Sequence, residues 1–265
     1  MNDESIKSLI KNDYNFDVQY VEKSNESTDG NVYIIQTSNE DSKFVIKIYD
    51  DIEHANSMIK LHTYLNENGL FVPNIIKNKD CLLYSIYNDE ICTKYIVCYS
   101  FVRGKKLKEV DFTTKRIKAV AEYLRKLHGI KENKFNLKSV PFNIKSDRKS
   151  LLHFDITKHN IFVDEDDKIC FIDFDDAKWG ASVCDVAIAI TNLFISRANG
   201  LDKDGVDTFI DSYYKEDTSL KEKELPMIKE AALMWLNSII DNPNFDTSTR
   251  AGLQNKIEQM NKLFG

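Results

Sequence analysis

Apolar and polar residues alternate in short runs over residues 14–49 of the chain. Alternation with a period of two predicts strands, because successive side chains of a strand point to opposite faces of a sheet. Three strands are expected, at residues 16–20, 32–35 and 44–48. The polar segment between the first two, residues 24–31, contains Asp29-Gly30, a dipeptide typical of turns. This region therefore predicts a small antiparallel sheet.

The period then changes to that of a helix. Residues 52–68 place apolar side chains at helical spacings, and Gly69 marks the end of the predicted helix. Alternating runs at residues 81–87 and 95–102 predict two more strands. The basic stretch that follows, residues 103–108, is expected to be a solvated edge at a boundary between domains.

Beyond this boundary the chain becomes mainly helical. An apolar stripe predicts a helix that begins at Asp111 or Thr113 and stops at Gly129. Residues 130–150 are polar and predict a connecting loop, whereas residues 151–173 predict a compact piece rich in strands. Four further helices are expected, at residues 183–198, 205–216, 226–240 and 247–264, with Pro226 at the first position of the third. A small strand-rich domain is thus followed by a larger helical one.

The composition excludes several classes of protein. Of 265 residues, 42% are hydrophobic and 29% are charged, so the chain can bury a core and is not intrinsically disordered. Its apolar runs are far shorter than the ~20 residues of a membrane-spanning helix, and no secretory signal pattern opens the sequence. We therefore expect a cytoplasmic protein with no membrane partner. The cysteines lack C-x-x-C spacing and are expected to be buried thiols: Cys81, Cys92, Cys98, Cys170 and Cys184.

The charge is unevenly distributed along the chain. The formal net charge is -6, from 36 basic and 42 acidic residues, which argues against a nucleic-acid partner. Residues 1–150 carry 24 bases and 21 acids, whereas residues 151–265 carry 12 bases and 21 acids. This asymmetry suits a phosphate ligand on the first part and a cation on the second, although an acidic surface that keeps the protein soluble would look the same.

One segment combines residues that can carry chemistry. His153, Asp155 and Asn160 have the spacing H-x-D-x-x-x-x-N, which is that of a kinase catalytic loop. Two short apolar runs joined by an acidic turn follow, and the second run ends at Asp173. A hairpin formed by these runs would return Asp173 beside Asn160.

These residue types suit the transfer of a γ-phosphoryl group. The reaction needs a hydroxyl held in line, an acceptor for its proton, and cations that neutralise the triphosphate. Asp155 can accept the proton, and the oxygens of Asn160 and Asp173 can ligate Mg²⁺. His153 is expected to brace the loop through hydrogen bonds rather than to act as a base.

With these motifs the chain resembles the aminoglycoside phosphotransferase and choline kinase family of small-molecule kinases. The family's H-G-D-x-x-x-x-N loop matches the segment above, and its I-D-[WF]-[ED]-[DY]-A motif matches residues 172–177. Residues 124–128, Gly180 and residues 184–187 resemble further family elements. The resemblance spans nearly the whole chain. It implies a bilobal, protein-kinase-like α+β fold, catalysis by Asp155, and metal ligation by Asn160 and Asp173.

The resemblance also implies a division of the chain. It places a nucleotide-binding lobe at residues 1–97, a hinge at residues 98–104, and a helical lobe with the catalytic loop and acceptor site at residues 105–265. Lys47 stands where the family has the strand lysine that contacts the α- and β-phosphates. Backbone groups in the hinge would pair with the adenine edge, near Ser100, Phe101 and Val102.

The chain departs from the family pattern at three places. Phe154 replaces the glycine that precedes the catalytic aspartate. Counting back from Leu65 places Met58 where the family has the glutamate that pairs with the lysine, so either the register shifts or this ion pair is absent. No glycine-rich phosphate loop is present, so any cover over the phosphates would be the polar segment at residues 24–31. Of the remaining candidates, His128 is expected to be a packed, hydrogen-bonded residue, and Asp185 to cap a helix or bond to the catalytic loop.

The sequence thus predicts a small-molecule O-phosphotransferase that uses ATP and Mg²⁺. A cationic acceptor such as an aminoglycoside or an amino alcohol is one candidate, and homoserine or a thiosugar is another. A protein kinase is a weaker alternative, because Asp173-Phe174-Asp175 lacks the glycine of the D-F-G motif. A catalytically silent nucleotide-binding module is the other alternative, because the acidic partner of Lys47 is uncertain.

Overall fold

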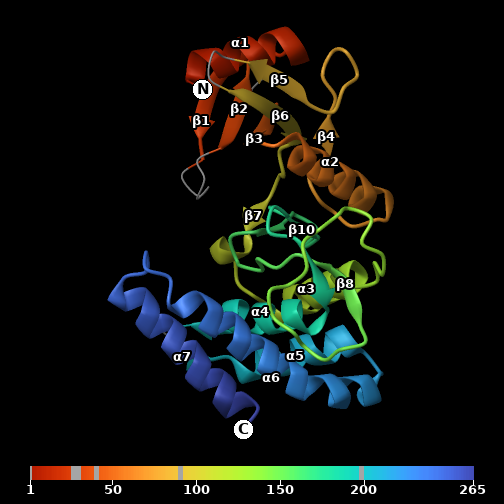
Figure 1. Ribbon diagram of the computed structural model, residues 1–265, viewed down its shortest axis with the longest axis vertical. Helices are drawn as coiled ribbons and strands as arrows, with labels where there is room; N and C mark the ends of the chain where they lie inside the picture. The colour runs from red at the N-terminus through yellow and green to blue at the C-terminus, as the bar shows by residue number, and fades with distance from the viewer. Residues whose placement is uncertain (1, 25–30, 39–41, 89–91, 197–199) are drawn as a thin grey trace. The chain divides into compact units, whose positions relative to one another are not determined.

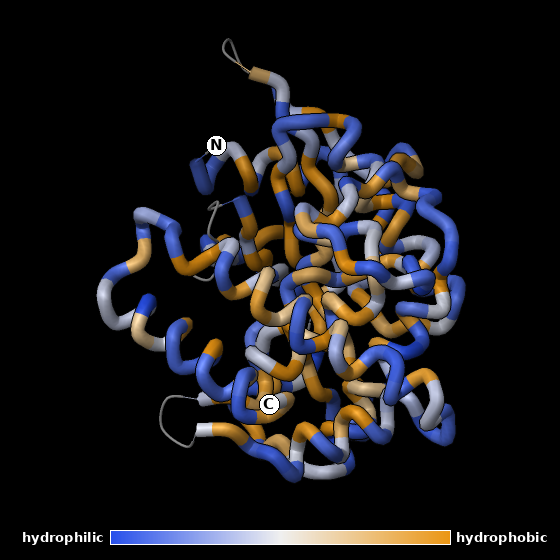
Figure 2. Tube along the Cα trace, turned by 60° about the horizontal axis from the view of Figure 1, so that its bottom comes forward, coloured by the Kyte–Doolittle hydropathy of each residue, from blue (hydrophilic) through white to orange (hydrophobic). Residues whose placement is uncertain are grey.

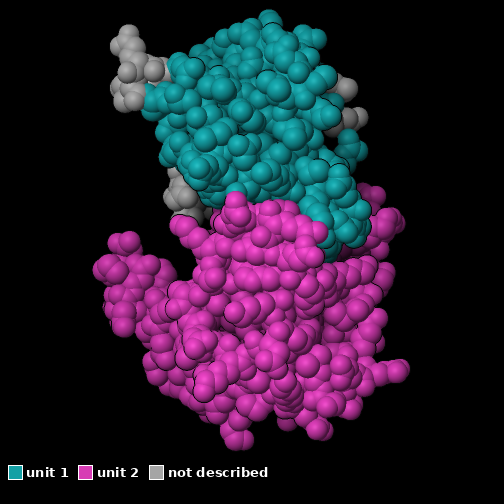
Figure 3. Space-filling model, turned by 45° about the vertical axis from the view of Figure 1, so that its right-hand side comes forward, with its two compact units in different colours: residues 1–103 teal, residues 104–265 magenta. Residues whose placement is uncertain are grey.

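A computed structural model of the chain describes residues 2–24, 31–38, 42–88, 92–196 and 200–265. The chain divides into two compact units, residues 1–103 and residues 104–265 (Figures 1 and 3). The first unit is an antiparallel sheet with two helices, and the second is mainly helical with short strand pairs. The predicted α+β class, with a small antiparallel sheet and a larger helical part, is confirmed.

The first unit is built on one antiparallel sheet. Its strand order is β1-β2-β3-β6-β4, and β5 pairs with the free part of β6. Strands are present in all five regions predicted from the alternation; the first three are longer than expected, the fourth is shorter, and the fifth is shifted toward the N-terminus. Their bounds are β1 Val18–Lys23, β2 Val32–Thr37, β3 Lys43–Tyr49, β4 Ile75–Ile76, β5 Ser85–Asn88 and β6 Thr93–Ser100.

Residues 81–84 do not form the strand expected there. The Asn78 side chain accepts hydrogen bonds from the backbone N–H groups of Asp80 and Leu82, which stabilises a turn. Cys81 within this turn has a left-handed φ of 63°. Side-chain oxygens that bond to nearby backbone compete with sheet formation, and this competition explains the difference.

A helix that the sequence analysis did not predict opens the chain. Helix α1, Asp3–Tyr14, is capped by the Asn2 side chain, which accepts a hydrogen bond from the Ser5 N–H at 2.9 Å. It buries one face against the sheet, together with strand residues such as Ile46, through Ile6, Leu9, Ile10 and Tyr14. The apolar residues do recur at helical spacing, but within a short and otherwise polar segment.

Helix α2, Ile52–Glu67, agrees with the predicted helix and packs on the other face of the sheet from α1. Asp51 caps it by accepting hydrogen bonds from the N–H groups of Glu53 and His54. Its buried side includes His62, whose ring lies 4.9 Å from that of Tyr99 on β6. The neighbouring residue Cys98 packs in the core cluster with α1. Adjacent residues of β6 therefore face different helices, because side chains alternate along a strand.

Five helices form most of the second unit. Helix α4 lies at its centre, and ten of its eleven residues are buried. The others bury one side each, and Figure 2 shows the corresponding change between apolar and polar residues along them. The bounds are α3 Thr114–Leu127, α4 Val183–Leu193, α5 Lys203–Tyr214, α6 Thr218–Ile240 and α7 Thr247–Leu263. No helix in the described part of the chain is long and apolar enough to span a membrane.

Two helix ends differ from the expected positions. Helix α4 ends at Leu193, and the chain continues into strand β12, Ile195–Ser196, instead of remaining helical. Helix α6 begins at Thr218, so Pro226 lies inside it and not at its first position. A proline inside a helix costs about 3 kcal/mol through the lost hydrogen bond and ring clash. The Asp217 cap and buried α6 residues such as Ile228 offset this cost.

Short antiparallel pairs frame the predicted strand-rich piece. Strand β8 pairs with β11, β9 with both β10 and β7, and β12 with β13. Gly104 begins this unit at a φ of +136°, and a Cβ there would lie 2.4 Å from the Val163 carbonyl oxygen. The bounds are β7 Lys105–Lys106, β8 Lys149–Leu152, β9 Ile161–Val163, β10 Ile169–Phe171, β11 Lys178–Ala181 and β13 Gly200–Leu201, with a 3-10 helix at Leu107–Glu109.

The cysteines only partly match the expectation. Cys98, Cys170 and Cys184 are buried thiols, whereas Cys81 is exposed and Cys92 is partly exposed. Cys81 is exposed because it lies in the surface turn described above and not in a strand.

Candidate functional site

The predicted catalytic loop connects β8 to β9 in the second unit. Strands β9 and β10 form an antiparallel hairpin in which Ile161 is opposite Phe171. Beyond the last pair, the Ile172 N–H donates to the Asn160 carbonyl oxygen at 3.0 Å. The hairpin predicted from the sequence is therefore confirmed, and it brings Asp173 next to Asn160 in the same unit.

His153 braces the loop, as predicted. Its ring is fully buried, and Nε2 donates to the Ile172 carbonyl oxygen at 2.9 Å. Nδ1 accepts a hydrogen bond from the Asp155 N–H at 3.3 Å. A ring that donates at Nε2 and accepts at Nδ1 is neutral, with its proton on Nε2. The histidine thus ties the loop to the strand that delivers Asp173, and neither nitrogen faces a substrate.

A buried carboxylate on α4 fixes the start of the loop. Asp185 accepts hydrogen bonds from the backbone N–H groups of His153, at 2.7 Å, and Phe154, at 2.9 Å. His128 Nε2 donates to the same carboxylate at 3.1 Å, while His128 Nδ1 lies 2.6 Å from the Tyr213 hydroxyl. Asp185 lies in the first turn of α4, where the helix dipole favours a negative charge. Both His128 and Asp185 therefore have the structural roles expected of them.

Phe154 adopts a backbone conformation that favours glycine. Its φ is +66°, in the left-handed region, which costs a residue with a Cβ about 1–2 kcal/mol. This geometry explains why the resembling family has glycine at the same place. In this chain the bond from the Phe154 N–H to Asp185 helps to hold the strained conformation. Asp173 also has a left-handed φ, of +64°.

Asn160 and Asp155 are held together by two hydrogen bonds. Asn160 Nδ2 donates to Asp155 Oδ2 at 2.6 Å and to the Asp155 carbonyl oxygen at 3.1 Å. Both amide hydrogens thus point toward Asp155, and the amide oxygen is the atom that Asn160 can offer to a cation. Asp155 Oδ1 is the oxygen that the carboxylate can offer to an acceptor hydroxyl.

The pKa of Asp155 is raised above the usual carboxyl range. Burial is the largest cause, because it disfavours the charged form. The negative charges of Asp173 and Asp176 raise this pKa further, whereas the hydrogen bond from Asn160 lowers it. A carboxylate with a raised pKa is a stronger base than an ordinary aspartate, which suits proton abstraction.

The donor set beside Asp155 suits a hard cation. Within the described ranges, no group of three or more His, Cys, Asp or Glu side chains is arranged to hold a metal ion. Asn160 and Asp173 supply one amide oxygen and one exposed carboxylate. Mg²⁺ binds through one or two carboxylates and takes its other ligands from water and phosphate oxygens, so this set fits Mg²⁺ better than a transition metal. The assignment of Asn160 and Asp173 as ligands stays a prediction.

Lys47 lies at the centre of the sheet in the first unit. It pairs with Val32 on β2 and Val97 on β6, and its neighbours Ile46 and Ile48 are buried toward α1. Because side chains alternate along a strand, Lys47 is on the opposite face of the sheet, on which α2 packs. Its role as a phosphate ligand stays a prediction.

Helix α2 does not bury an acid where the family has its glutamate. Met58 at that position is buried in the core, with 2% of its surface exposed. Glu53 and Glu67 are the acidic residues of α2, and both are exposed. Both explanations, a shifted register and an absent ion pair, stay predictions.

The predicted hinge, residues 98–104, includes the last three residues of β6 and the four that follow. Ser100 exchanges hydrogen bonds with Asn74, donating from its N–H at 2.8 Å and accepting at its hydroxyl oxygen at 2.9 Å. The Ser100 N–H is therefore engaged within the unit, and any adenine contact would come from other backbone groups. Phe101 and Val102 come next, and the Lys43 amine lies 5.6 Å from the Phe101 ring centre. Of the polar loop at residues 24–31, residues 25–30 lie outside the described residues.

Sequence reasoning missed one residue that supports the loop. Asn192, the one residue of α4 that is not buried, donates from Nδ2 to the Ile156 carbonyl oxygen at 3.0 Å. An amide within the apolar sequence of α4 was a signal, because polar groups in such a helix need a partner. Asp185 near the start of α4 and Asn192 near its end therefore both hold the catalytic loop through hydrogen bonds to its backbone.

Comparisons with known proteins agree with this geometry. A family model described as "Phosphotransferase enzyme family" matches residues 136–215, which include the catalytic loop, the hairpin and α4. The predicted resemblance to the aminoglycoside phosphotransferase and choline kinase family is confirmed. The matched residues all lie in the second unit. A search of curated proteins finds no match to the sequence.

Solved structures extend the similarity to the first unit. The amicoumacin kinase hAmiN, in complex with AMP-PNP, Ca²⁺ and Ami, is 15% identical with a TM-score of 0.75, covering 99% of this chain and 94% of that one. A microcompartment-associated aminopropanol kinase is 16% identical with a TM-score of 0.70, covering 99% and 95%. The choline kinase LicA from Streptococcus pneumoniae is 12% identical with a TM-score of 0.59, covering 98% of each chain. At these identities the likeness establishes the fold of both units.

Proposed function

We propose that this protein is an ATP-dependent phosphotransferase that moves the γ-phosphate to a hydroxyl group of a small molecule. One observation carries the proposal: Asn160 orients the Asp155 carboxylate, and the β9–β10 hairpin returns Asp173 beside them. These are the three groups that the sequence assigns to base and metal ligands. The similar structures named above include kinases of amicoumacin, aminopropanol and choline, which supports a small-molecule acceptor.

Asp155 is the proposed base. The hydrogen bond from Asn160 fixes Oδ2 and orients the plane of the carboxylate, so that Oδ1 can accept the proton of a hydroxyl. The raised pKa increases its basicity. Asp185 acts through the backbone of residues 153–154, and we propose that it positions the base without touching a substrate.

Asn160 and Asp173 are the proposed ligands of Mg²⁺. Bound Mg²⁺ neutralises charge on the triphosphate as the phosphoryl group is transferred. The left-handed φ of Asp173 turns the chain at the end of the hairpin and sets the direction of its carboxylate. In the first unit, we propose that Lys47 binds the α- and β-phosphates and that backbone groups near Phe101 and Val102 bind adenine. We place the reaction in the cytoplasm, which supplies ATP.

A catalytically silent nucleotide-binding module is the second candidate function. Met58, buried where the family has its glutamate, favours it, because the lysine of an active kinase normally pairs with that acid. The intact set of Asp155, Asn160 and Asp173 favours an active enzyme. A screen for ADP release decides between the two.

The test combines an acceptor screen with two variants. Purified protein is incubated with Mg²⁺, ATP and a panel of aminoglycosides, amino alcohols, homoserine and sugars, and any product is examined by mass spectrometry for one added phosphate. Asp155→Asn is expected to lower kcat by about 10² or more with little change in nucleotide affinity, because the base acts on the acceptor. Asp173→Ala is expected to weaken Mg²⁺-dependent ATP binding itself.

Asp166→Asn is the matched control. Asp166 is an exposed residue in the turn of the same hairpin, so its kinetics should equal those of the wild type. Wild-type turnover in both Asp155→Asn and Asp173→Ala would refute the roles assigned to these residues. ATP binding without transfer to any acceptor would favour the silent module.

A further inference from the structure

Tyr213, a buried residue of α5, has no part in the mechanism proposed above. Its hydroxyl lies 2.6 Å from His128 Nδ1, and the other nitrogen of that ring, Nε2, donates to Asp185 Oδ2 at 3.1 Å. The His153 N–H of the catalytic loop donates to the same carboxylate oxygen at 2.7 Å. Tyr213 is therefore two hydrogen bonds away from the oxygen that holds the start of the loop.

The direction of these hydrogen bonds follows from what each group can donate. A guanidinium only donates, and that of Arg148 bonds to the Tyr213 hydroxyl oxygen. Burial raises the pKa of Tyr213, so the hydroxyl keeps its proton, although the charge of Arg148 and this bond act to lower the pKa. That proton points to His128 Nδ1, the acceptor beside it, and the neutral ring carries its own proton on Nε2. Each residue of the line thus donates to the next: Arg148, Tyr213, His128 and Asp185.

A buried carboxylate holds Arg148 at the far end of this line. Arg148 Nη1 donates to Glu224 Oε2 at 2.9 Å, and the Tyr214 hydroxyl donates to the same oxygen at 2.8 Å. Glu224 lies on α6 with 2% of its surface exposed, and a carboxylate buried to this degree needs such partners to remain charged. Hydrogen bonds therefore connect α6, α5 and α4 to the start of the loop.

The other protonation states of His128 would disturb the loop. If the proton lay on Nδ1 alone, the lone pair of Nε2 would face Asp185 Oδ2, and the two would repel each other. The carboxylate would then turn away from the His153 N–H that shares this oxygen. The proton of the Tyr213 hydroxyl occupies the place that a proton on Nδ1 would take, so it excludes this state and the doubly protonated ring alike.

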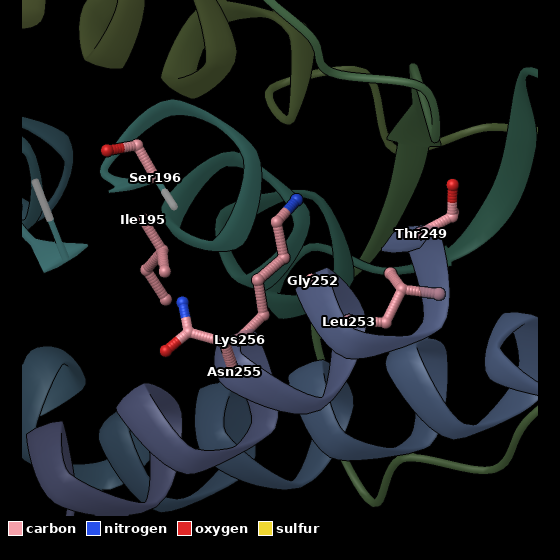
Figure 4. A pocket seen from close by; sticks show the side chains of 7 residues that line it. All are labelled: Ile195, Ser196, Thr249, Gly252, Leu253, Asn255 and Lys256. Carbon is pink, nitrogen blue, oxygen red and sulfur yellow. The ribbon is translucent and has the colours of Figure 1, made fainter. Parts of the chain in front are cut away.

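The loop has a second attachment that does not depend on this line. Asn192 on α4 donates to the Ile156 carbonyl oxygen at 3.0 Å and accepts a hydrogen bond from the Lys256 amine at 2.6 Å. Figure 4 shows the Lys256 side chain extending from α7. Because this attachment holds the residue after the proposed base, a disturbance at the start of the loop should displace it there without releasing the whole loop.

We infer that Tyr213 is a positioning residue for the catalytic loop: its hydroxyl keeps the proton of His128 on Nε2, and His128 thereby keeps the Asp185 carboxylate turned toward the loop. The inference rests on the proposed function and adds a residue that acts on the base through others. Since the line of hydrogen bonds ends at the loop, loss of the hydroxyl should change kcat rather than the binding of ATP.

The experiment compares two buried tyrosines that are neighbours on α5. Tyr213→Phe removes the hydroxyl that bonds to His128. Tyr214→Phe removes the hydroxyl that bonds to Glu224, whose ion pair with Arg148 remains. Both variants keep the aromatic ring and lose one buried hydrogen bond, so Tyr214→Phe is the matched control.

Three quantities are measured in each protein. Deuterium uptake at the N–H groups of His153 and Phe154 reports the attachment of the loop. The ¹⁵N chemical shifts of the His128 ring report which nitrogen carries the proton. ADP release with Mg²⁺, ATP and the acceptor panel described above, or with water as the acceptor, gives kcat and KM. The first two measurements require no activity.

In the wild type, the ring shifts should show a proton on His128 Nε2 and none on Nδ1. In Tyr213→Phe this state should no longer dominate, and uptake at residues 153–154 should become about tenfold faster. Its kcat should fall about threefold to tenfold, as for the loss of one neutral hydrogen bond, while KM for ATP changes by less than about twofold. Tyr214→Phe should match the wild type in all three measurements.

A merely structural role would lower the thermal stability of the two variants alike and leave uptake at residues 153–154 equal in both, and this result would overturn the inference. A wild-type His128 ring with a proton on Nδ1 would also overturn it, and this measurement decides the matter even if Tyr213→Phe does not fold. If no acceptor raises ADP release and no Mg²⁺-dependent ATP binding is seen, the proposed function fails, whereas uptake and ring shifts still test the link from Tyr213 to the loop.

Discussion

Replacing Asp185 by alanine should uncouple the catalytic loop from the core. The carboxylate accepts two backbone N–H groups of the loop and the His128 ring, and all of these lie in the interior. A buried donor left without its acceptor costs about 1–3 kcal/mol. The two backbone donors together therefore predict a loss of about 2–6 kcal/mol in the free energy of unfolding of the second unit.

This loss is large compared with the total stability of a domain, which is about 5–15 kcal/mol. At about 2–4 °C per kcal/mol for a domain of this size, the midpoint of thermal unfolding should fall by about 10 °C. Phe154 would also lose the bond that holds its left-handed φ, so the base would be misplaced and kcat should fall together with stability.

Circular dichroism on heating and ADP release at 20 °C measure the two effects. Asp185→Asn separates them further, because it keeps one oxygen acceptor but turns an amide donor toward a second N–H, and it should lie between the wild type and Asp185→Ala. Asp207→Asn, an exposed change on α5, is the control. A midpoint for Asp185→Ala within 2 °C of the wild type would refute the reasoning.

Two further predictions concern the same loop. Phe154→Gly removes the strain of about 1–2 kcal/mol at φ +66° but loses the side-chain contact with Phe142, so the free energy of unfolding should change by less than about 1 kcal/mol and turnover should be retained. Phe154→Val should lower both the stability, measured by denaturant titration, and the turnover, measured by ADP release. The pKa of Asp155 is raised by folding, so the folded protein holds this proton more tightly than the unfolded chain does. The charged form therefore costs stability at neutral pH, and this cost disappears as the pH falls through the raised pKa. Asp155→Asn should thus unfold at a higher temperature than the wild type at pH 7 and lose that advantage in acid, and a lower midpoint at pH 7 would contradict this prediction. The rate of the wild type should fall on the acid side at a pH above the usual carboxyl range.

The catalytic hairpin could be predicted from sequence because it depends on local signals. Two apolar runs with an acidic turn between them predict antiparallel pairing, and this pairing brings Asp173 close to Asn160 in space. The helix at Asp3–Tyr14 was missed because its apolar residues are few, and burial against the sheet supplies the stability that local propensity lacks. The start of α6 was misjudged at Pro226, because packing of the helix can offset the local penalty of a proline.

Side-chain roles that depend on tertiary contacts were less accessible. The sequence suggested that Asp185 contacts the loop, but the two N–H groups it accepts depend on how α4 lies against β8. The left-handed φ of Phe154 could not be read from a phenylalanine, which rarely adopts it. Asn192 and Lys256 meet through a bond between residues 64 positions apart, and no local pattern encodes such a contact.

The attachment of the loop to α4 has a consequence for motion. Because the Asp185 carboxylate is buried in this helix, the N–H groups of His153 and Phe154 can exchange with solvent only when the loop separates from α4. Their deuterium uptake should therefore be slow in the wild type and should speed up in Asp185→Ala. Any movement that admits or releases reactants would then have to occur in other segments, around a catalytic centre that stays still.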